Sequence, residues 1–275
     1  MNKKVTMLPE DYRFNLSDFA FFLSVMKNPR AYRNVLSIIM DEPDIEIKEV
    51  KVEQVILNKS GKRAIRLDAW AQTMDERQFN MEMQNDTKGD DVRKRSRFYQ
   101  GLMDSPVLKS GEKTKYKMLP STVIIFITQD DIFGKDLAKY TFTEQCEEIA
   151  DLKLEDGTTK IFLNMSSKNG VPELVSMLQY MKDTNLENPE VTVKDSRLIE
   201  LDEIVSEVRE SDEWEVVKMN ILEIGKEIGK EAGAKEKLKE LVQKMHGKGY
   251  SIEEIANMFS ERIELIKELV EDRTE

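Results

Sequence analysis

The chain has 275 residues, of which 40% are hydrophobic and 35% charged, and its 42 Lys and Arg against 53 Asp and Glu give a formal net charge of −11. This composition is typical of a soluble globular protein, and the excess of acidic residues argues against a general nucleic-acid coat. Cys146 and His246 are each the single residue of their type, which excludes an internal disulfide, a multi-thiolate zinc site and a two-histidine metal site. Unless His246 serves a catalytic function, carboxylates must carry any enzymatic chemistry.

Two features of the sequence bear on location. No apolar run approaches the roughly 20 residues that a membrane span requires. The opening residues, MNKKVTMLPEDYRF, lack the apolar core of a signal peptide. We therefore expect a cytoplasmic protein with no membrane partner.

The elements predicted from hydrophobic periodicity alternate between helices and strands. A helix is interrupted at Asn28-Pro29, because proline cannot continue a helix interior, and STVIIFIT is the most hydrophobic strand. In chain order we predict a helix over 17–40, strands over 45–57, 63–71 and 78–84, a basic helix over 91–104, strands over 121–128 and 160–164, and a helix over 172–181. This order predicts an α/β domain over 1–195, with a core sheet flanked by helices, followed by a charged helical region over 196–275.

The strands over 63–71 and 78–84 carry two acidic side chains that we expect to lie side by side. If these strands form a hairpin in which apolar residues pair with apolar residues, opposed residue numbers sum to 150. This register places Asp68 directly across from Glu82, with Cβ atoms about 4.5–5.5 Å apart. Two carboxylates so close repel each other unless a cation lies between them. Oxygen ligands favour Mg²⁺ or Mn²⁺, although two ordinary acids on a surface hairpin would give the same spacing.

Positive charge is concentrated after this hairpin, between Lys88 and Lys117. This segment has nine basic and four acidic residues, a net charge of +5, so the remainder of the chain carries −16. In the basic helix, Arg93, Arg97 and Gln100 share one face by their i, i+4, i+7 spacing. Such segregation indicates a local polyanion site, although a solvated helix and loop would have the same composition.

The string RLDAWAQTMDERQFNMEMQ, which ends in Glu82-x-Gln84, resembles the acidic strand pair of the PD-(D/E)XK nuclease superfamily. The basic sequence RKRSRFYQ that follows at 93–100 resembles the recombination-promoting nuclease and transposase-like branch. This resemblance implies a restriction-endonuclease-like core and a DNA endonuclease that depends on Mg²⁺ or Mn²⁺. Asp68 and Glu82 would bind the metal, and Gln84 would take the catalytic position at which many superfamily members carry a lysine.

The resemblance also implies a DNA contact on the basic helix, made by Arg93, Lys94, Arg97 and Tyr99. Lys94 or Arg97 could supply the positive charge that Gln84 lacks, and Tyr99 could either stack on a base or belong to the core. A catalytically weak or inactive relative that binds DNA or a protein remains the alternative, because a glutamine amide cannot donate positive charge.

The region after residue 195 has features of self-association. Gly225, Gly229 and Gly233 recur every four residues, and Ser251 with Glu254 forms a capping-box signature for a helical hairpin over 250–272. Residues 250–275 carry three basic and eight acidic side chains, a poor match to DNA. We therefore expect the C-terminal helices to mediate contacts with protein, including a second copy of the chain.

Overall fold

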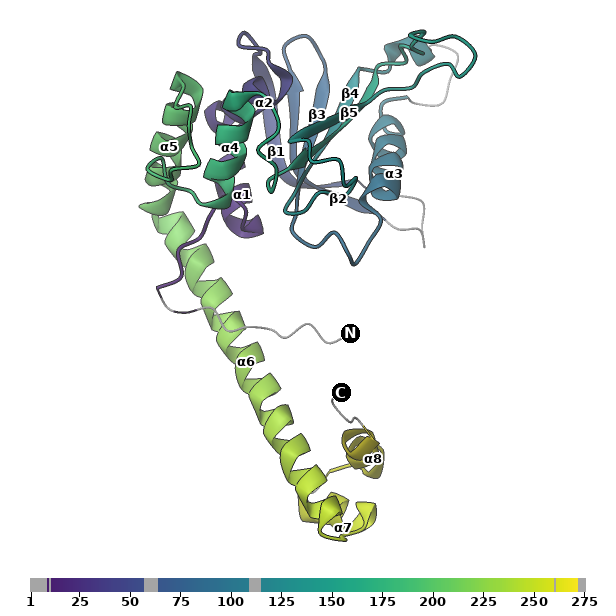
Figure 1. Ribbon diagram of the computed structural model, residues 1–275, viewed down its shortest axis with the longest axis vertical. Helices are drawn as coiled ribbons and strands as arrows, with labels where there is room; N and C mark the ends of the chain where they lie inside the picture. Colours follow the sequence, from purple (N-terminus) through teal and green to yellow (C-terminus); the bar gives the residue numbers. More distant parts are fainter. Residues whose placement is uncertain (1–8, 10, 57–63, 109–114, 260, 272–275) are drawn as a thin grey trace. The chain divides into compact units, whose positions relative to one another are not determined.

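The computed structural model describes Pro9 and residues 11–56, 64–108, 115–259 and 261–271 (Figure 1). Its elements divide into two compact units, one spanning Arg13–Trp214 and one that includes the chain from Glu215 onward. In chain order the elements are α1 (Phe19–Met26), α2 (Pro29–Met40), β1 (Ile47–Ile56), β2 (Ile65–Thr73), β3 (Gln78–Gln84), α3 (Val92–Asp104), a 3-10 turn η1 (Tyr116–Met118), β4 (Thr122–Thr128), β5 (Lys139–Phe142), β6 (Thr158–Asn164), α4 (Pro172–Lys182), α5 (Ser196–Arg209), α6 (Asp212–Gly247), α7 (Ile252–Phe259) and α8 (Ile263–Glu271).

A six-stranded mixed sheet forms the centre of the first unit, with strand order β1-β2-β3-β4-β6-β5. The pairs β1–β2, β2–β3 and β5–β6 are antiparallel, and β3–β4 and β4–β6 are parallel. The predicted α/β core is thereby confirmed. β5 was not among the predicted strands, because its four residues lie at an edge of the sheet and are too few to show a periodic apolar pattern.

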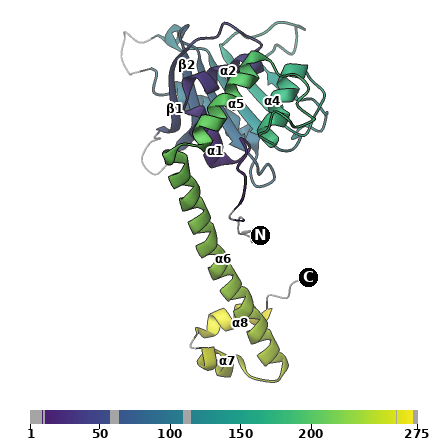
Figure 2. The ribbon, with the colours of Figure 1, turned by 90° about the vertical axis from the view of Figure 1, so that its left-hand side faces the viewer.

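Helices cover both faces of the sheet. α1, α2, α4 and α5 lie on one face and α3 lies on the other (Figures 1 and 2). Every residue of β4 is buried, as expected for a central strand that is covered on both sides. α3 packs over this strand through a cluster that includes Tyr99, Met103, Phe126 and Phe162.

The predicted interruption between the first two helices is confirmed. α1 ends at Met26, and α2 begins at Pro29. Proline lacks a backbone N–H, but the first N–H groups of a helix have no intrahelical acceptor, so no hydrogen bond is lost at this position. The side chain of Asn28 caps the new helix by accepting a hydrogen bond from the Arg30 backbone N–H at 2.9 Å. The chain therefore turns here and buries the apolar face of α2 in the core.

The first compact unit extends beyond residue 195, where the sequence suggested a soft boundary. α5 buries Leu198, Leu201 and Ile204, and its Glu200 accepts a hydrogen bond from Asn34 of α2 at 2.9 Å. Trp214, at the start of α6, packs its ring 4.7 Å from that of Phe21. The many charged residues of α5 hid its apolar stripe from the sequence pattern. Because α5 and Trp214 pack on the first two helices, the first unit extends to Trp214.

The second unit has a small core of its own, formed by the C-terminal part of α6 with α7 and α8. Val242, Ile255, Ile266 and Leu269 are its buried centre. The capping box predicted for α7 is present: the Ser251 N–H donates to Glu254 and the Glu254 N–H donates to Ser251 Oγ, at 2.8 and 3.2 Å. α7 and α8 lie within the span 250–272, and the C-terminal part of α6 packs against them through Val242. Among the described helices, none has the length and apolar character of a membrane span.

Candidate active site

The predicted register of β2 and β3 is confirmed along the part of the hairpin that forms a ladder. Ala69 pairs with Met81 and Gln72 with Gln78, so opposed residue numbers sum to 150. The ladder stops at Ala69 and Met81. Asp68 and Glu82 are the next residues on the two strands. Beyond the last backbone pair, their carboxylates accept hydrogen bonds from backbone N–H groups of the opposite strand.

The carboxylates of Asp68 and Glu82 are held by reciprocal hydrogen bonds across the two strands. The backbone N–H of Asp68 donates to Glu82 Oε1 at 3.0 Å, and the backbone N–H of Met83 donates to Asp68 Oδ2 at 3.1 Å. Both residues are buried, with exposed fractions of 5% for Asp68 and 0% for Glu82. The structure therefore brings the two predicted metal ligands together in one buried site.

Burial makes this pair of acids electrostatically unfavourable. Burial, together with the charge of Glu82, raises the pKa of Asp68 from 3.8 to about 8. Burial also raises the pKa of Glu82, although hydrogen bonds from Asn80 and Asp68 and the charge of Arg95 oppose the shift. The site therefore favours either a proton or a cation over two bare negative charges.

Arg95 of α3 supplies a positive charge that the sequence analysis did not assign. Its Nη2 donates to Glu82 Oε2 and its Nη1 to Gln84 Oε1, both at 2.7 Å, while its Nε donates to the Tyr99 hydroxyl at 2.9 Å. The guanidinium also lies over the rings of Tyr99 and Phe126, at 4.9 and 5.5 Å from their centroids. The i, i+4 spacing of Arg95 and Tyr99 was the available signal, because it places the arginine beside the buried stripe of the helix.

Gln84 and Asn80 complete the polar side of β3. The Gln84 oxygen accepts from Arg95, and its amide nitrogen donates to the backbone carbonyl of Asp86. Asn80 Nδ2 donates to Glu82 Oε1 at 2.9 Å, whereas the buried Asn80 Oδ1 has no hydrogen-bond partner among the residues that the structure describes. Asn80 shares its strand face with Glu82 and Gln84, so alternation along the strand could have identified it as a member of the site.

The expected DNA-binding residues separate into exposed and buried ones. Arg93, Lys94 and Arg97 are exposed, and the first two form ion pairs with Asp91, the N-cap of α3. Tyr99 is buried in the cluster beneath the helix, which agrees with the core alternative that the sequence left open for it. The basic residue of α3 that donates a hydrogen bond to the acidic pair is Arg95, through Glu82, and not Lys94 or Arg97.

The donor set fits a hard divalent cation. Within the described residues no group of three or more His, Cys, Asp and Glu side chains is arranged to hold a metal. Mg²⁺ commonly uses one or two carboxylates and completes its shell with water and substrate phosphates, which Asp68 and Glu82 could satisfy. The partnerless oxygen of Asn80 is a further hard donor beside them. Arg95 pairs with the same Glu82, so a metal and the guanidinium compete for one carboxylate.

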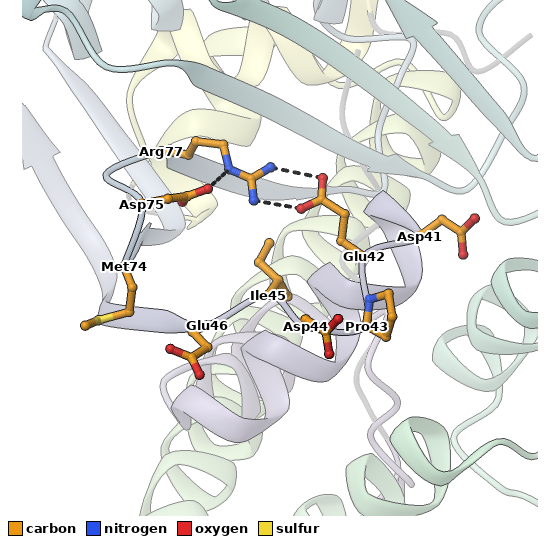
Figure 3. A pocket seen from close by; sticks show the side chains of 9 residues that line it. All are labelled: Asp41, Glu42, Pro43, Asp44, Ile45, Glu46, Met74, Asp75 and Arg77. Carbon is orange, nitrogen blue, oxygen red and sulfur yellow. Dashed lines mark hydrogen bonds and ion pairs between the residues drawn. The ribbon is translucent and has the colours of Figure 1, made fainter.

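A hollow of about 440 Å³ lies at the turn of the β2–β3 hairpin and is not lined by Asp68 or Glu82 (Figure 3). There the Arg77 guanidinium holds both oxygens of Glu42, at 3.0 and 2.7 Å. This pair ties the hairpin to the α2–β1 connection. Its many carboxylates make this hollow a poor site for phosphate; they are Asp41, Glu42, Asp44, Glu46 and Asp75.

Comparison with known families agrees with this geometry. A family model described as "PD-(D/E)XK nuclease family transposase" matches residues 15–202, which is more than half of the chain and includes β2, β3 and α3. The chain belongs to this family. The family assignment confirms the resemblance found in the sequence, and it supports a nuclease or transposase-like function for the first compact unit. Comparisons with curated proteins and with solved structures gave no match.

Proposed function

We propose that this family member is a metal-dependent DNA endonuclease in which Asp68 and Glu82 hold Mg²⁺ or Mn²⁺. The observation that supports the proposal is the reciprocal bonding of these two buried carboxylates at the point where the β2–β3 ladder ends. A bound divalent ion would polarise a phosphoryl oxygen and lower the pKa of a bound water. The family supplies DNA as the substrate class.

The chain's own residues would orient and balance this site. The backbone N–H groups of Asp68 and Met83 fix one oxygen of each carboxylate, which leaves the other oxygens for a cation or for Arg95. Because Gln84 is neutral, we assign to Arg95, which donates to Glu82, the fixed positive charge that a lysine of the strand would otherwise supply. Its fork of donors suits a phosphate oxygen.

A non-catalytic DNA- or protein-binding relative is the second candidate, and Arg95 favours it. The bond between Arg95 and Glu82 at 2.7 Å already neutralises one carboxylate without a metal. In such a protein the ion pair would be structural, and binding of DNA through Arg93 and Arg97 would be indifferent to divalent ions.

Cleavage of supercoiled plasmid DNA with Mg²⁺ or Mn²⁺ distinguishes the two candidates. We expect nicking or linearisation by the unmodified chain and a loss of at least about 100-fold in rate in Asp68→Asn and Glu82→Gln. Asp130→Asn, which changes an exposed carboxylate, is the matched control and should retain full activity. Equal cleavage by all four proteins would refute the assignment, and absence of cleavage together with metal-independent DNA binding would favour the regulator.

We also propose that the chain acts in the cytoplasm and that its second unit self-associates. Exposed apolar side chains on α6, α7 and α8 support self-association, namely Leu241, Met258 and Ile263. Sedimentation velocity of the full chain would reveal a dimer or higher species if the proposal holds. A monomer at all concentrations would contradict it.

A further inference from the structure

A hollow of about 410 Å³ lies between α3 and the β5–β6 edge of the sheet, apart from the acidic pair. Its walls combine aromatic rings with basic side chains. The aromatic residues are Phe133, Phe142 and Phe162, and the basic residues are Arg93 and Arg97 of α3 and Lys160 of β6. Neither the family assignment nor the proposed metal site assigns a role to this hollow.

The three phenylalanine rings form one connected cluster. The Phe133 centroid lies 5.0 Å from that of Phe142 and 5.3 Å from that of Phe162, and the latter two centroids are 5.8 Å apart. Phe162 is buried, whereas Phe142 remains 43% exposed. The cluster therefore holds Phe142 from beneath and leaves part of its ring open, which suits a stacking partner that is flat and apolar on its faces.

The cations beside these rings are available to an anion. Across the described ranges, with their gaps at 57–63 and 109–114, no ion pair is formed by Arg97 or by Lys160. Lys160 lies directly opposite Phe142 in the β5–β6 register, so the charge and the open ring are neighbours. Glu144 is the acid that lines the hollow, against three basic residues. The local charge balance is positive in a protein whose net charge is −11.

The sheet register relates this hollow to the acidic pair. Glu82, Phe126 and Phe162 are aligned across β3, β4 and β6, on the face that α3 covers. Neighbouring strands lie about 4.8 Å apart, so the backbone of Phe162 is about 10 Å from that of Glu82. One polynucleotide strand is long enough to contact both places.

We propose that this hollow binds an unpaired nucleotide of a DNA strand, with the base against Phe142 and the flanking phosphates on Arg97 and Lys160. The combination of an exposed ring with unpaired cations is the feature that single-stranded nucleic acid recognises. Bases within a duplex are stacked on one another and cannot offer a face to Phe142. This inference deepens the proposed endonuclease function and rests on it: the substrate would be DNA with a single-stranded segment near the cleaved bond.

Fluorescence anisotropy in EDTA tests the subsite without cleavage. The probes are a fluorescein-labelled single-stranded oligonucleotide, the corresponding blunt duplex, and the same duplex with a single-stranded overhang. For Phe142→Ala we expect binding of the single strand and of the overhang to weaken by about tenfold, because an aromatic–base stack is worth about that much, and duplex binding to change by less than about twofold. Phe142→Leu keeps apolar packing on Phe133, so it provides the same test if the alanine variant does not fold.

Two further variants complete the test. Lys160→Gln should weaken single-strand binding. It should also make the negative slope of log affinity against log salt concentration shallower by about 0.7, the value for one phosphate contact on a single strand. Phe98→Leu is the matched control, since Phe98 is 40% exposed on α3 but does not line the hollow, and it should leave the ratio of single-strand to duplex affinity unchanged.

The outcomes separate the subsite from the nuclease. If the chain cleaves or binds DNA but neither Phe142 variant changes the ratio of single-strand to duplex affinity, the subsite is refuted and the proposed function survives. If the unmodified chain binds none of the three probes in EDTA and cleaves no plasmid with Mg²⁺ or Mn²⁺, both proposals fail. If it cleaves plasmid but binds none of the probes, the subsite alone is refuted. A loss of single-strand affinity in Phe142→Ala and Phe142→Leu, with duplex affinity retained, supports the subsite even if cleavage is never observed.

Discussion

Replacing Asp68 with asparagine removes an ionisable group whose charged form the folded protein tolerates poorly in the absence of a metal. The two side chains are nearly isosteric, and the asparagine oxygen can still accept the hydrogen bond that the Met83 N–H donates to Asp68 at 3.1 Å. The substitution therefore changes the charge of the site and leaves its shape in place. We expect the metal-free variant to be more stable than the unmodified chain at neutral and higher pH.

The magnitude follows from the raised pKa of Asp68. The folded protein keeps this proton up to about pH 8, whereas the pKa of a free aspartate is 3.8. Between these values the folded state binds more protons than the unfolded state, so the free energy of unfolding falls as the pH rises. At 1.36 kcal/mol for each pKa unit, the contribution of Asp68 falls by about 3–4 kcal/mol between pH 5 and pH 8.

Urea unfolding in EDTA at pH 5, 7 and 8 measures this term. We expect the difference in unfolding free energy between Asp68→Asn and the unmodified chain to grow by about 3–4 kcal/mol from pH 5 to pH 8. Asp130→Asn, at an exposed site, should show no such trend. Addition of Mn²⁺ at pH 8 should stabilise the unmodified chain and not the Asp68→Asn variant. A difference that is constant from pH 5 to pH 8 would refute the electrostatic reasoning.

Two more substitutions test the surroundings of the acidic pair. Arg95→Lys should lower the free energy of unfolding by about 1–3 kcal/mol in urea titrations. The reason is that a lysine cannot donate to Glu82, Gln84 and Tyr99 together. Arg93→Lys, on the exposed side of the helix, is the control and should have little effect. Asp91→Ala removes the cap that accepts hydrogen bonds from the Arg93 and Lys94 N–H groups, and it should lower the midpoint of urea unfolding. Asp91→Ser should recover most of this loss, and equal stability of the two variants would show that the cap contributes nothing.

Much of the fold could be predicted from periodicity alone, because most elements of the first unit have a clear apolar pattern. The alternation around Asp68 and Glu82 indicated the register of the hairpin, because it pairs apolar residues with apolar residues, as in the observed pair of Ala69 and Met81. The edge strand β5 and the extent of the first unit were not predicted. Both depend on contacts between distant segments, as when α5 packs its apolar stripe on α2.

The site could be predicted only in part. The sequence identified the acidic residues, because two carboxylates on adjacent strands are a local pattern. It did not identify Arg95 among the four basic residues of α3, since all four are near in sequence and only helix packing decides which one turns toward Glu82. Tyr99 was ambiguous for the same reason, and its burial beneath the helix resolved the ambiguity.

Calorimetric titration of the full chain with Mn²⁺ at pH 8 tests the shared metal site most directly. The account predicts saturable binding to the unmodified chain, with affinity weakened at least about tenfold by either Asp68→Asn or Glu82→Gln, because each substitution removes one of two charged ligands. Asp130→Asn should bind Mn²⁺ as the unmodified chain does. Mn²⁺ affinity that is the same in all four proteins would contradict the claim that Asp68 and Glu82 hold one ion between them.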